Sequence, residues 1–371
     1  MAISSSSNGT QRSVQGIPPM RDRWWWTLPA GLFGWSVRLR HWMFDAGLRS
    51  SRKGALPTVV MGNITVGGTG KTPHVGALLQ ALGASDPGRK WGILSRGYGR
   101  QTKGFLEVDK AGSPAEFGDE PLELARRFPA NAVAVSEDRL AGLEAMQAAG
   151  GVDAVLLDDG FQHRRLSPTY AIVLVDATQP VDRDHFLPRG RLRDVPSRLS
   201  AADAVIITRC EDALTKGDLR LWRHRLHLGA DQLLLHTGSK IEGLRNLNTK
   251  RYASWPRRCI AVSGIAHPSQ FEMTLSRNCT VTQHFAYPDH HPFTTKEVGE
   301  WKAALGADNA PPEAIITTEK DASRIRALEL PEDLPILVLG MQVLWWDEEA
   351  LTDLLTSIRQ RVDASLAEPD I

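Results

Sequence analysis

The clearest chemical signature in this sequence is a glycine-rich stretch, GNITVGGTGKTP, over residues 62–73. Glycines let backbone N–H groups point at phosphate oxygens, and the start of a following helix adds partial positive charge. Lys71 is placed to reach the β- and γ-phosphates of a nucleotide, and the Thr72 hydroxyl to bind Mg²⁺. The strict pattern has glycine where this chain has Thr65, so we expect Gly67 and Gly68 to supply the flexibility instead. The alternative is a glycine-rich turn that binds no ligand. The residues that we expect to hold the nucleotide are Thr65, Val66, Gly67, Gly68, Thr69, Gly70, Lys71 and Thr72.

An acidic pair follows a second apolar segment, in the stretch LLDDGFQH over residues 156–163. Carboxylates at the end of a buried strand form the usual second half of a nucleotide–Mg²⁺ site. Because Mg²⁺ keeps several of its waters, one or two carboxylates suffice, and the sequence does not decide between Asp158 and Asp159. The simpler interpretation is that Asp158 caps a turn.

Two other stretches contain candidates for proton transfer. Asp119, in GDEP over residues 118–121, is either the N-cap of a helix or a carboxylate that accepts the proton of an attacking hydroxyl. The spacing alone favours the cap. PDHHPF over residues 288–293 pairs two histidines with an aspartate. Neighbours in sequence point apart and no further ligands follow at suitable spacing, so a catalytic or orienting histidine fits better than zinc.

Arginines and lysines follow several other predicted strands. SRGYGR over residues 95–100 combines glycines with arginines that can bind phosphate. Arg139 falls in the first turn of a helix, where the helix dipole disfavours a cation, so we expect a partner anion. LPRGRLRD over residues 187–194 is either a solvated loop or a source of transition-state stabilisation, with Asp194 near the metal. TTEKD over residues 317–321 can hold a nucleotide base, although the motif alone is weak.

Alternating β-branched or leucine-rich runs and helical patterns must position these residues. This alternation predicts an α/β fold with a parallel sheet and helices on both faces. In such sheets ligands bind beyond the carboxyl ends of the strands, where the candidate residues fall. The predicted helices include 73–82, 120–127 and 137–148. The predicted strands are 58–62, 90–94, 131–135, 153–157, 171–175 and 203–207, then 232–236, 259–263, 280–285, 314–317 and 335–339.

A predicted helix over residues 28–48 precedes the first strand. Leu32, Trp35, Leu39 and Trp42, with Met43 and Ala46, share one face, and basic residues lie on a separate arc. Such a helix can lie in a bilayer interface, and the alternative is an amphipathic helix packed on its own domain.

Composition excludes several classes of protein. The net charge of +1 gives no argument for nucleic-acid binding. The three cysteines lack metal-binding or disulfide spacing and indicate a reducing compartment. No apolar run reaches the roughly 18–20 residues of a membrane span, and the Ser-rich start is not a secretory signal, so we expect a cytoplasmic protein.

In combination, nine stretches resemble the tetraacyldisaccharide 4′-kinase family of lipid A biosynthesis. They occur in the family's order over roughly residues 28–345. The resemblance implies a P-loop NTPase-type, mostly parallel sheet and a second, smaller α/β domain joined by a two-stranded linker. It implies ATP- and Mg²⁺-dependent phosphorylation of the 4′-hydroxyl of an acylated glucosamine disaccharide 1-phosphate, at the cytoplasmic face of the bacterial inner membrane. The matching stretches are GNITVGGTGKTP (62–73), SRGYGR (95–100), GDEP (118–121), SEDR (136–139), LLDDGFQHRRL (156–166), LPRGRLRD (187–194), SGIAHPSQF (263–271), PDHHPF (288–293) and TTEKDASR (317–324).

The resemblance also implies roles for individual residues. Asp119 matches the catalytic aspartate and His290 the histidine that pairs with it, and the family has glutamate where this chain has Asp194. The N-terminal helix would dock on the membrane, and we expect no nucleic acid and no obligate protein partner. The expected catalytic residues are Asp119, His290, Lys71 and Arg193; the metal ligands Thr72, Asp158, Asp159 and Asp194; and the substrate-binding residues Arg96, Tyr98, Arg139, Gln162 and His163.

The expected organisation is a tail over residues 1–20, a docking helix over 21–50, a kinase core over 51–225, a second domain over 226–345 and a C-terminal helix and tail over 346–371. Two other functions fit the phosphate loop alone: a membrane-associated switch ATPase, and a membrane-surface binding protein with an inactive loop. The acidic pair and the histidine loop argue against both, because neither function needs a separate proton acceptor.

Overall fold

The structure is a computed structural model that describes residues 24–289, 291–306 and 310–367. The predicted tail over residues 1–20 and the predicted catalytic residue His290 lie outside the described residues.

Six parallel strands form the sheet that carries the phosphate loop, in the order β9, β8, β2, β6, β3, β5, with the short antiparallel β4 at the edge. Each of the six parallel strands begins and ends within two residues of its predicted limits. This agreement confirms an α/β fold with a mostly parallel sheet. These strands are hydrophobic on both faces because helices cover both. Their bounds are β2 Thr58–Asn63, β3 Trp91–Ser95, β4 Leu106–Glu107, β5 Val133–Val135, β6 Ala154–Asp158, β8 Tyr170–Asp176 and β9 Ala204–Thr208.

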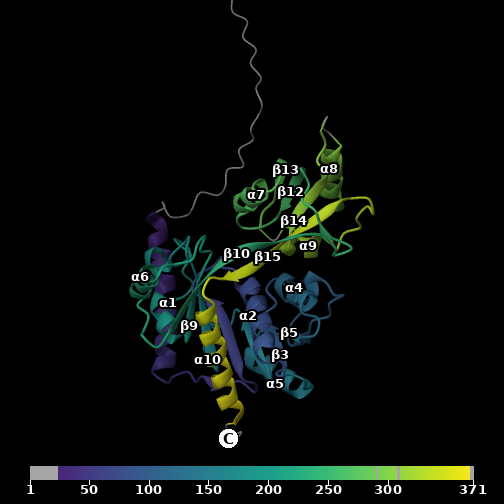
Figure 1. Ribbon diagram of the computed structural model, residues 1–371. Helices are drawn as coiled ribbons and strands as arrows, with labels where there is room; N and C mark the ends of the chain where they lie inside the picture. The colour runs from purple at the N-terminus through teal and green to yellow at the C-terminus, as the bar shows by residue number, and fades with distance from the viewer. Residues whose placement is uncertain (1–23, 290, 307–309, 368–371) are drawn as a thin grey trace, which may run out of the picture.

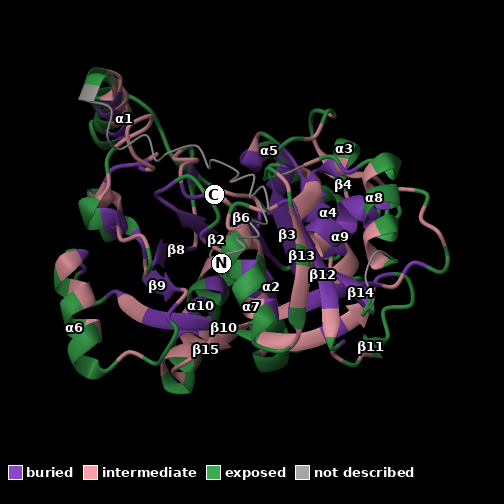
Figure 2. Ribbon diagram, turned by 90° about the horizontal axis from the view of Figure 1, so that it is seen from above, coloured by how far each residue is buried: buried purple, intermediate pink, exposed green. Residues whose placement is uncertain are grey.

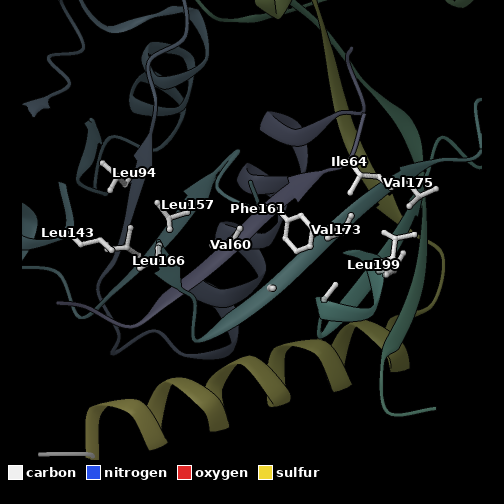
Figure 3. Packing of buried hydrophobic residues seen from close by; sticks show 14 of the residues in the cluster. Val60, Ile64, Leu94, Leu143, Leu157, Phe161, Leu166, Val173, Val175 and Leu199 are labelled. Carbon is white, nitrogen blue, oxygen red and sulfur yellow. The ribbon is translucent and has the colours of Figure 1, made fainter. Parts of the chain in front are cut away.

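Alternate residues of each strand enter opposite hydrophobic clusters, as the pleat requires. Val59 and Met61 of β2 pack with α2 and α10. Val60, on the other face, packs with α5 and with Phe161, as Figure 3 shows for part of this cluster. The helices around this sheet are α2 Lys71–Ser85, α3 Pro114–Phe117, α4 Asp119–Arg127, α5 Arg139–Ala149, α6 Lys216–Arg225 and α10 Glu348–Ala367; the 3₁₀ turns are η2 Trp24–Trp26, η3 Val181–Arg183 and η4 Pro196–Ala201.

A long strand, β10, continues the sheet into a second group of elements. Residues 233–236 pair in parallel with β9, and residues 237–246 pair antiparallel with β15. Figure 1 shows this pair crossing between the two parts of the molecule. Beyond it, β15, β14, β12 and β13 are parallel neighbours with their own clusters. The bounds are β10 Leu233–Asn246, β11 Tyr252–Ala253, β12 Arg258–Ser263, α7 Pro268–Ser276, β13 Thr280–Ala286, α8 Thr295–Leu305, β14 Ala314–Thr318, α9 Glu319–Ile325 and β15 Ile336–Trp345.

The predicted strand over 232–236 is only the beginning of β10. Its later half includes exposed and half-buried residues in a ladder with few neighbours, so its hydrophobic pattern is weak and the sequence did not indicate it.

The first helix, α1 (Thr27–Asp45), lies at the margin of the molecule (Figure 2). It packs inward through Ala30, Gly34, His41 and Phe44. Its apolar face points outward instead of onto the protein, so the packed-helix interpretation is wrong for that face. The exposed residues on it are Leu28, Leu32, Trp35, Leu39 and Trp42. Within the described part of the chain no helix is long and apolar enough to span a membrane. Two short strands that follow and lie apart from the large sheet are β1 Arg52–Lys53 and β7 Leu166–Ser167.

Candidate active site

The glycine-rich stretch forms the predicted strand, loop and helix. β2 ends at Asn63, and α2 begins at Lys71 with Gly70 as its N-cap. Gly67 and Gly70 have φ values of +102° and +83°, which side chains rarely tolerate. The Asn63 amide donates to Thr69 Oγ1 at 2.8 Å and so holds the loop closed at its base. The loop therefore ends at a helix N-terminus, the arrangement that binds anions.

Two cations and one carboxylate meet beside this loop. Lys71 Nζ donates to Asn63 Oδ1 at 3.4 Å and lies 4.0 Å from Asp159 Oδ1. Arg193 Nη1 donates to Asp159 Oδ2 at 3.1 Å, and the same guanidinium also bonds Asn63 Oδ1. Burial opposes ionisation of Asp159, but these contacts, with the hydrogen bond from Arg193 foremost, lower its pKa below the usual range. Asp159 is thus an ionised partner of Lys71 and Arg193.

Asp158 has the opposite environment. Its side chain is buried, and Thr72 Oγ1 donates to Oδ2 at 3.5 Å, while Oδ1 is buried without a hydrogen-bond partner in the described structure. Burial, then the charge of Asp159, raise the pKa of Asp158 to about 7. A hydroxyl beside a carboxylate with a vacant oxygen suits a hard divalent cation, so these residues fit Mg²⁺. The described residues contain no group of three or more His, Cys, Asp or Glu side chains that could hold a metal ion, and Mg²⁺ does not need one.

Asp194 is held by α1. Its carboxylate Oδ1 lies 2.5 Å from His41 Nε2 and also accepts from the Val195 N–H at 2.8 Å. Thr72, by contrast, contacts Asp158. Asp194 thus forms an anchoring contact with α1, which the sequence could not indicate because 153 positions separate the two partners, and its metal contact stays a prediction.

Asp119 is the first residue of α4, and Gly118 is the N-cap, so the simpler interpretation of Asp119 as the cap is wrong. Its Oδ2 lies 3.9 Å from Nε of Arg324, on α9 in the other part of the molecule. Arg324 also bonds Asp321 Oδ1 at 2.8 Å and donates to the His291 carbonyl at 3.0 Å. Arg324 therefore connects Asp119 to the histidine loop, a role that the sequence did not indicate although it is the last residue of TTEKDASR.

The predicted substrate-binding residues lie in three different environments. Arg96 and Tyr98 are exposed beyond β3. Arg139 is buried, donating to the Glu137 and Asp159 carbonyls at 2.9 Å and 3.2 Å, and burial lowers its pKa. Gln162 donates to the Asn63 carbonyl at 2.6 Å. The Arg139 bonds hold the acidic loop to the start of α5, and the Gln162 bond ties that loop to the end of β2, where the phosphate loop begins. The fifth residue, His163, has its Nε2 buried and without a hydrogen-bond partner in the described structure, and burial, then the charge of Arg139, lower its pKa.

His74 is a further residue that the sequence did not single out. Its Nδ1 lies 2.7 Å from the Gly70 carbonyl and its Nε2 2.9 Å from Thr237 Oγ1 on β10. Burial lowers its pKa to about 4, so it is a neutral hydrogen-bonding link between the phosphate loop and β10. Its position directly after Lys71-Thr72-Pro73 was the only signal available.

A Ser–His–Glu chain also occurs in the second part of the molecule. Ser263 Oγ lies 2.8 Å from His284 Nε2, and His284 Nδ1 lies 2.9 Å from Glu272 Oε2. Ser263 has no exposed surface, so no substrate can reach its hydroxyl. These bonds join β12, β13 and α7 and do not form a hydrolytic site.

Comparison with known proteins gives one family. A protein-family model described as tetraacyldisaccharide-1-P 4′-kinase matches residues 23–360. The tetraacyldisaccharide 4′-kinase of Porphyromonas gingivalis is 34% identical over 358 residues, which are 92% of this chain and 98% of that protein. That of Parabacteroides distasonis is 35% identical over 307 residues, which are 80% of this chain and 82% of that protein.

A solved structure agrees with these relatives. The LpxK protein of Aquifex aeolicus, crystallised as an "apo" form in complex with ATP, is 27% identical, with a TM-score of 0.69. The match covers 89% of this chain and 98% of that chain. The sequence relatives and this fold agree along most of the chain, which therefore belongs to the tetraacyldisaccharide-1-P 4′-kinase family.

Proposed function

We propose a mechanism for this chain, which by its family is an ATP-dependent tetraacyldisaccharide 4′-kinase of lipid A biosynthesis. In this mechanism its residues position ATP and the lipid so that the γ-phosphate passes to the 4′-hydroxyl of the lipid. Phosphoryl transfer depends mainly on positioning and on charge neutralisation. The residues around the phosphate loop divide into a donor half, which holds the triphosphate, and an acceptor half, which receives the sugar hydroxyl.

In the donor half, the backbone of residues 65–72 surrounds the triphosphate, and the Lys71 ammonium and Arg193 guanidinium neutralise its charge. Support comes from their shared partner, Asp159, which holds both cations at the loop. When phosphate oxygens arrive, each cation can keep this carboxylate and add a phosphate contact, because ammonium and guanidinium groups have several donors.

The observation that carries the proposal is the contact of Thr72 with Asp158, whose other oxygen is buried without a partner in the described structure. We propose that these two side chains hold Mg²⁺ and that Asp159 contributes charge from its ion pairs. Bound Mg²⁺ would neutralise charge on the β- and γ-phosphates. Loss of the Asp158 proton, which burial retains up to about pH 7, accompanies binding of the cation.

In the acceptor half, Asp119 accepts the proton of the 4′-hydroxyl as the phosphate transfers. Its carboxylate is mostly buried and lies near the Arg324 guanidinium, which also holds the backbone of the histidine loop. Orientation of Asp119 by His290 rests on the family resemblance, since His290 lies outside the described residues.

We also propose that α1 lies in the interface of the cytoplasmic face of the bacterial inner membrane, as a peripheral or monotopic anchor. The exposed apolar stripe supports this proposal, because Trp and Leu on one face of a helix favour the headgroup boundary. We further propose a kinase core over 51–225, a second domain over 226–345 and a C-terminal helix and tail over 346–371. Separate hydrophobic clusters around the two groups of strands support the division, with the first residues of β10 still packed in the core and α10 packed on it.

The experiment replaces Asp119 with alanine and measures the mass of the lipid after incubation with ATP, Mg²⁺ and acylated disaccharide 1-phosphate. We expect turnover to fall by about 10²- to 10⁴-fold at saturating substrates, the usual contribution of a general base. Asp212→Ala, in an exposed loop, is the matched control. Near-normal turnover of Asp119→Ala would rule out the base, and ATP hydrolysis without any lipid phosphorylation would favour a switch ATPase.

A further inference from the structure

A polar cavity of about 150 Å³ lies on the α5 side of the sheet, away from Lys71 and Thr72. Its floor includes Val60 and Phe161, which Figure 3 shows in the hydrophobic cluster. Three segments distant in sequence form its walls: the residue before β1, the loop after β6 and the turn η4. The polar and charged residues that line it are Ser51, His163, Arg164, Ser167 and Arg198.

Arg198 is the unusual member of this lining. Its guanidinium lies 5.2 Å from the ring of Phe161 and forms no hydrogen bond or ion pair with any of the residues that the structure describes. Its Nε is buried. Burial, then the charge of Arg164, lower the pKa of Arg198. A half-buried guanidinium beside a second cation is costly to folding unless an anion accompanies it.

The neighbouring groups leave room for that anion. Arg164 is engaged, with Nη2 2.8 Å from Asp45 Oδ1 and Nη1 3.1 Å from the His41 carbonyl, both on α1. The charged groups that act on Arg198 are Arg164, Arg40, Asp45 and Asp194, so three guanidinium groups face two carboxylates. One positive charge is in excess within this cluster. His163 lines the same cavity, and its buried Nε2 can donate a hydrogen bond.

We propose that this cavity binds one phosphate group of a lipid, with Arg198 as its principal ligand and His163 and the rim hydroxyl of Ser167 as further donors. A guanidinium fork matches the oxygens of a phosphate, and the bond is charge-assisted. The cavity has room for one such group.

The position of the cavity favours a lipid source for this phosphate. Arg164, in its wall, bonds the inner face of α1, and the outer face of α1 carries the exposed apolar stripe. A helix in the bilayer interface therefore brings the phosphate layer close to the cavity. This step rests on the proposed membrane contact of α1. Two sources share the chemistry: the 1-phosphate of the disaccharide substrate and the phosphodiester of a membrane phospholipid.

The test compares Arg198→Gln with Arg220→Gln, which removes an exposed arginine of α6. In one arm, KM for acylated disaccharide 1-phosphate is measured in neutral detergent. In a second arm, flotation measures binding to phosphatidylcholine vesicles with and without phosphatidylglycerol. For Arg198→Gln we expect either the KM for the lipid or the affinity for the vesicles to weaken about tenfold, the equivalent of one charge-assisted hydrogen bond. The control should change neither quantity. The affected arm identifies the source.

Thermal unfolding separates binding from a structural role. If Arg198 serves only an anion, Arg198→Gln leaves the melting temperature of the free protein unchanged or raises it, whereas a structural arginine would lower it. Arg198→Lys retains the charge and should weaken the affected arm less than Arg198→Gln. The proposal is overturned if both arms match the control. It is also overturned if Arg198→Gln loses only the rise in melting temperature that inorganic phosphate causes, because the cavity would then bind a free phosphate and no lipid. A chain without lipid kinase activity would contradict the proposed function but would leave the vesicle arm interpretable.

Discussion

Replacement of Asp158 by asparagine should stabilise the protein in the absence of Mg²⁺ and ATP. Asparagine keeps the shape of the side chain and removes its charge. The Asp158 carboxyl is buried, and its pKa rises from 3.8 to about 7, so the folded protein retains a proton that the unfolded chain releases. Between these two values the folded state binds more protons than the unfolded state, and the free energy of unfolding of the wild type therefore falls as pH rises.

The size of the effect follows from the shift. A difference of about 3 pKa units corresponds to roughly 4 kcal/mol at about pH 8, above both pKa values. Local relaxation reduces this figure, so we expect Asp158→Asn to be about 2–4 kcal/mol more stable than the wild type there. The advantage should shrink as pH falls and should nearly vanish by about pH 3, where Asp158 is largely protonated in both states.

Urea unfolding, followed by tryptophan fluorescence across this pH range, measures the difference. Asp212→Asn, in an exposed loop, is the control and should match the wild type. Mg²⁺ and ATP should reverse the order, because ligand that binds only the native state stabilises the wild type and the Asn variant lacks a charged metal ligand. Equal stability at about pH 8, or a difference that does not change with pH, would refute the assignment of a costly buried charge to Asp158.

Three other changes test separate parts of the site. Lys71→Ala should lower kcat by about 10²- to 10³-fold in a lipid phosphorylation assay, because it removes a preorganised positive charge. Its circular dichroism spectrum should be unaltered, and normal turnover would contradict the role proposed for Lys71 in the donor half. Trp35→Glu combined with Trp42→Glu should abolish flotation of the protein with vesicles. The melting temperature should not fall, since the two side chains are 62% and 57% exposed, and retained flotation would exclude α1 as the anchor. His41→Ala should cost about 1.5–3 kcal/mol and expose α1 to protease, because the buried Asp194 carboxylate loses a hydrogen-bond donor; an unchanged digestion pattern would show that this contact does not hold the helix.

The strands and the phosphate loop were predictable because their signals are local. A strand buried on both faces is a short continuous apolar run, and a loop that needs positive φ needs glycine. Of the two glycines predicted to compensate for Thr65, Gly67 has positive φ but Gly68 does not; Gly70, at the N-cap of α2, takes the second such position. The later half of β10 was missed because a strand in a two-stranded ladder is only partly buried and has no clear pattern.

The acidic pair shows where sequence reasoning stops. The order of residues indicated that Asp158 and Asp159 follow a buried strand, but it gave both the same role. In the fold, Asp158 faces Thr72, while Asp159 takes the ion pairs of Lys71 and Arg193. A single step along the chain at a strand end turns the side chain to another environment, and only the neighbours from other loops make the two carboxylates different.

By itself the sequence determined the α/β class, the strand–loop–helix at residues 62–73 and the apolar stripe of the first helix, since each is a pattern within some twenty residues. The tertiary structure decided which face of that helix is exposed. It also decided that Asp194 forms a hydrogen bond with His41 and that Arg324 lies beside Asp119, in the other part of the molecule. It left the Arg198 guanidinium against the ring of Phe161, without a hydrogen bond or ion pair among the described residues. These contacts join residues far apart in the chain. Their partners depend on the packing of whole elements, which no local pattern contains.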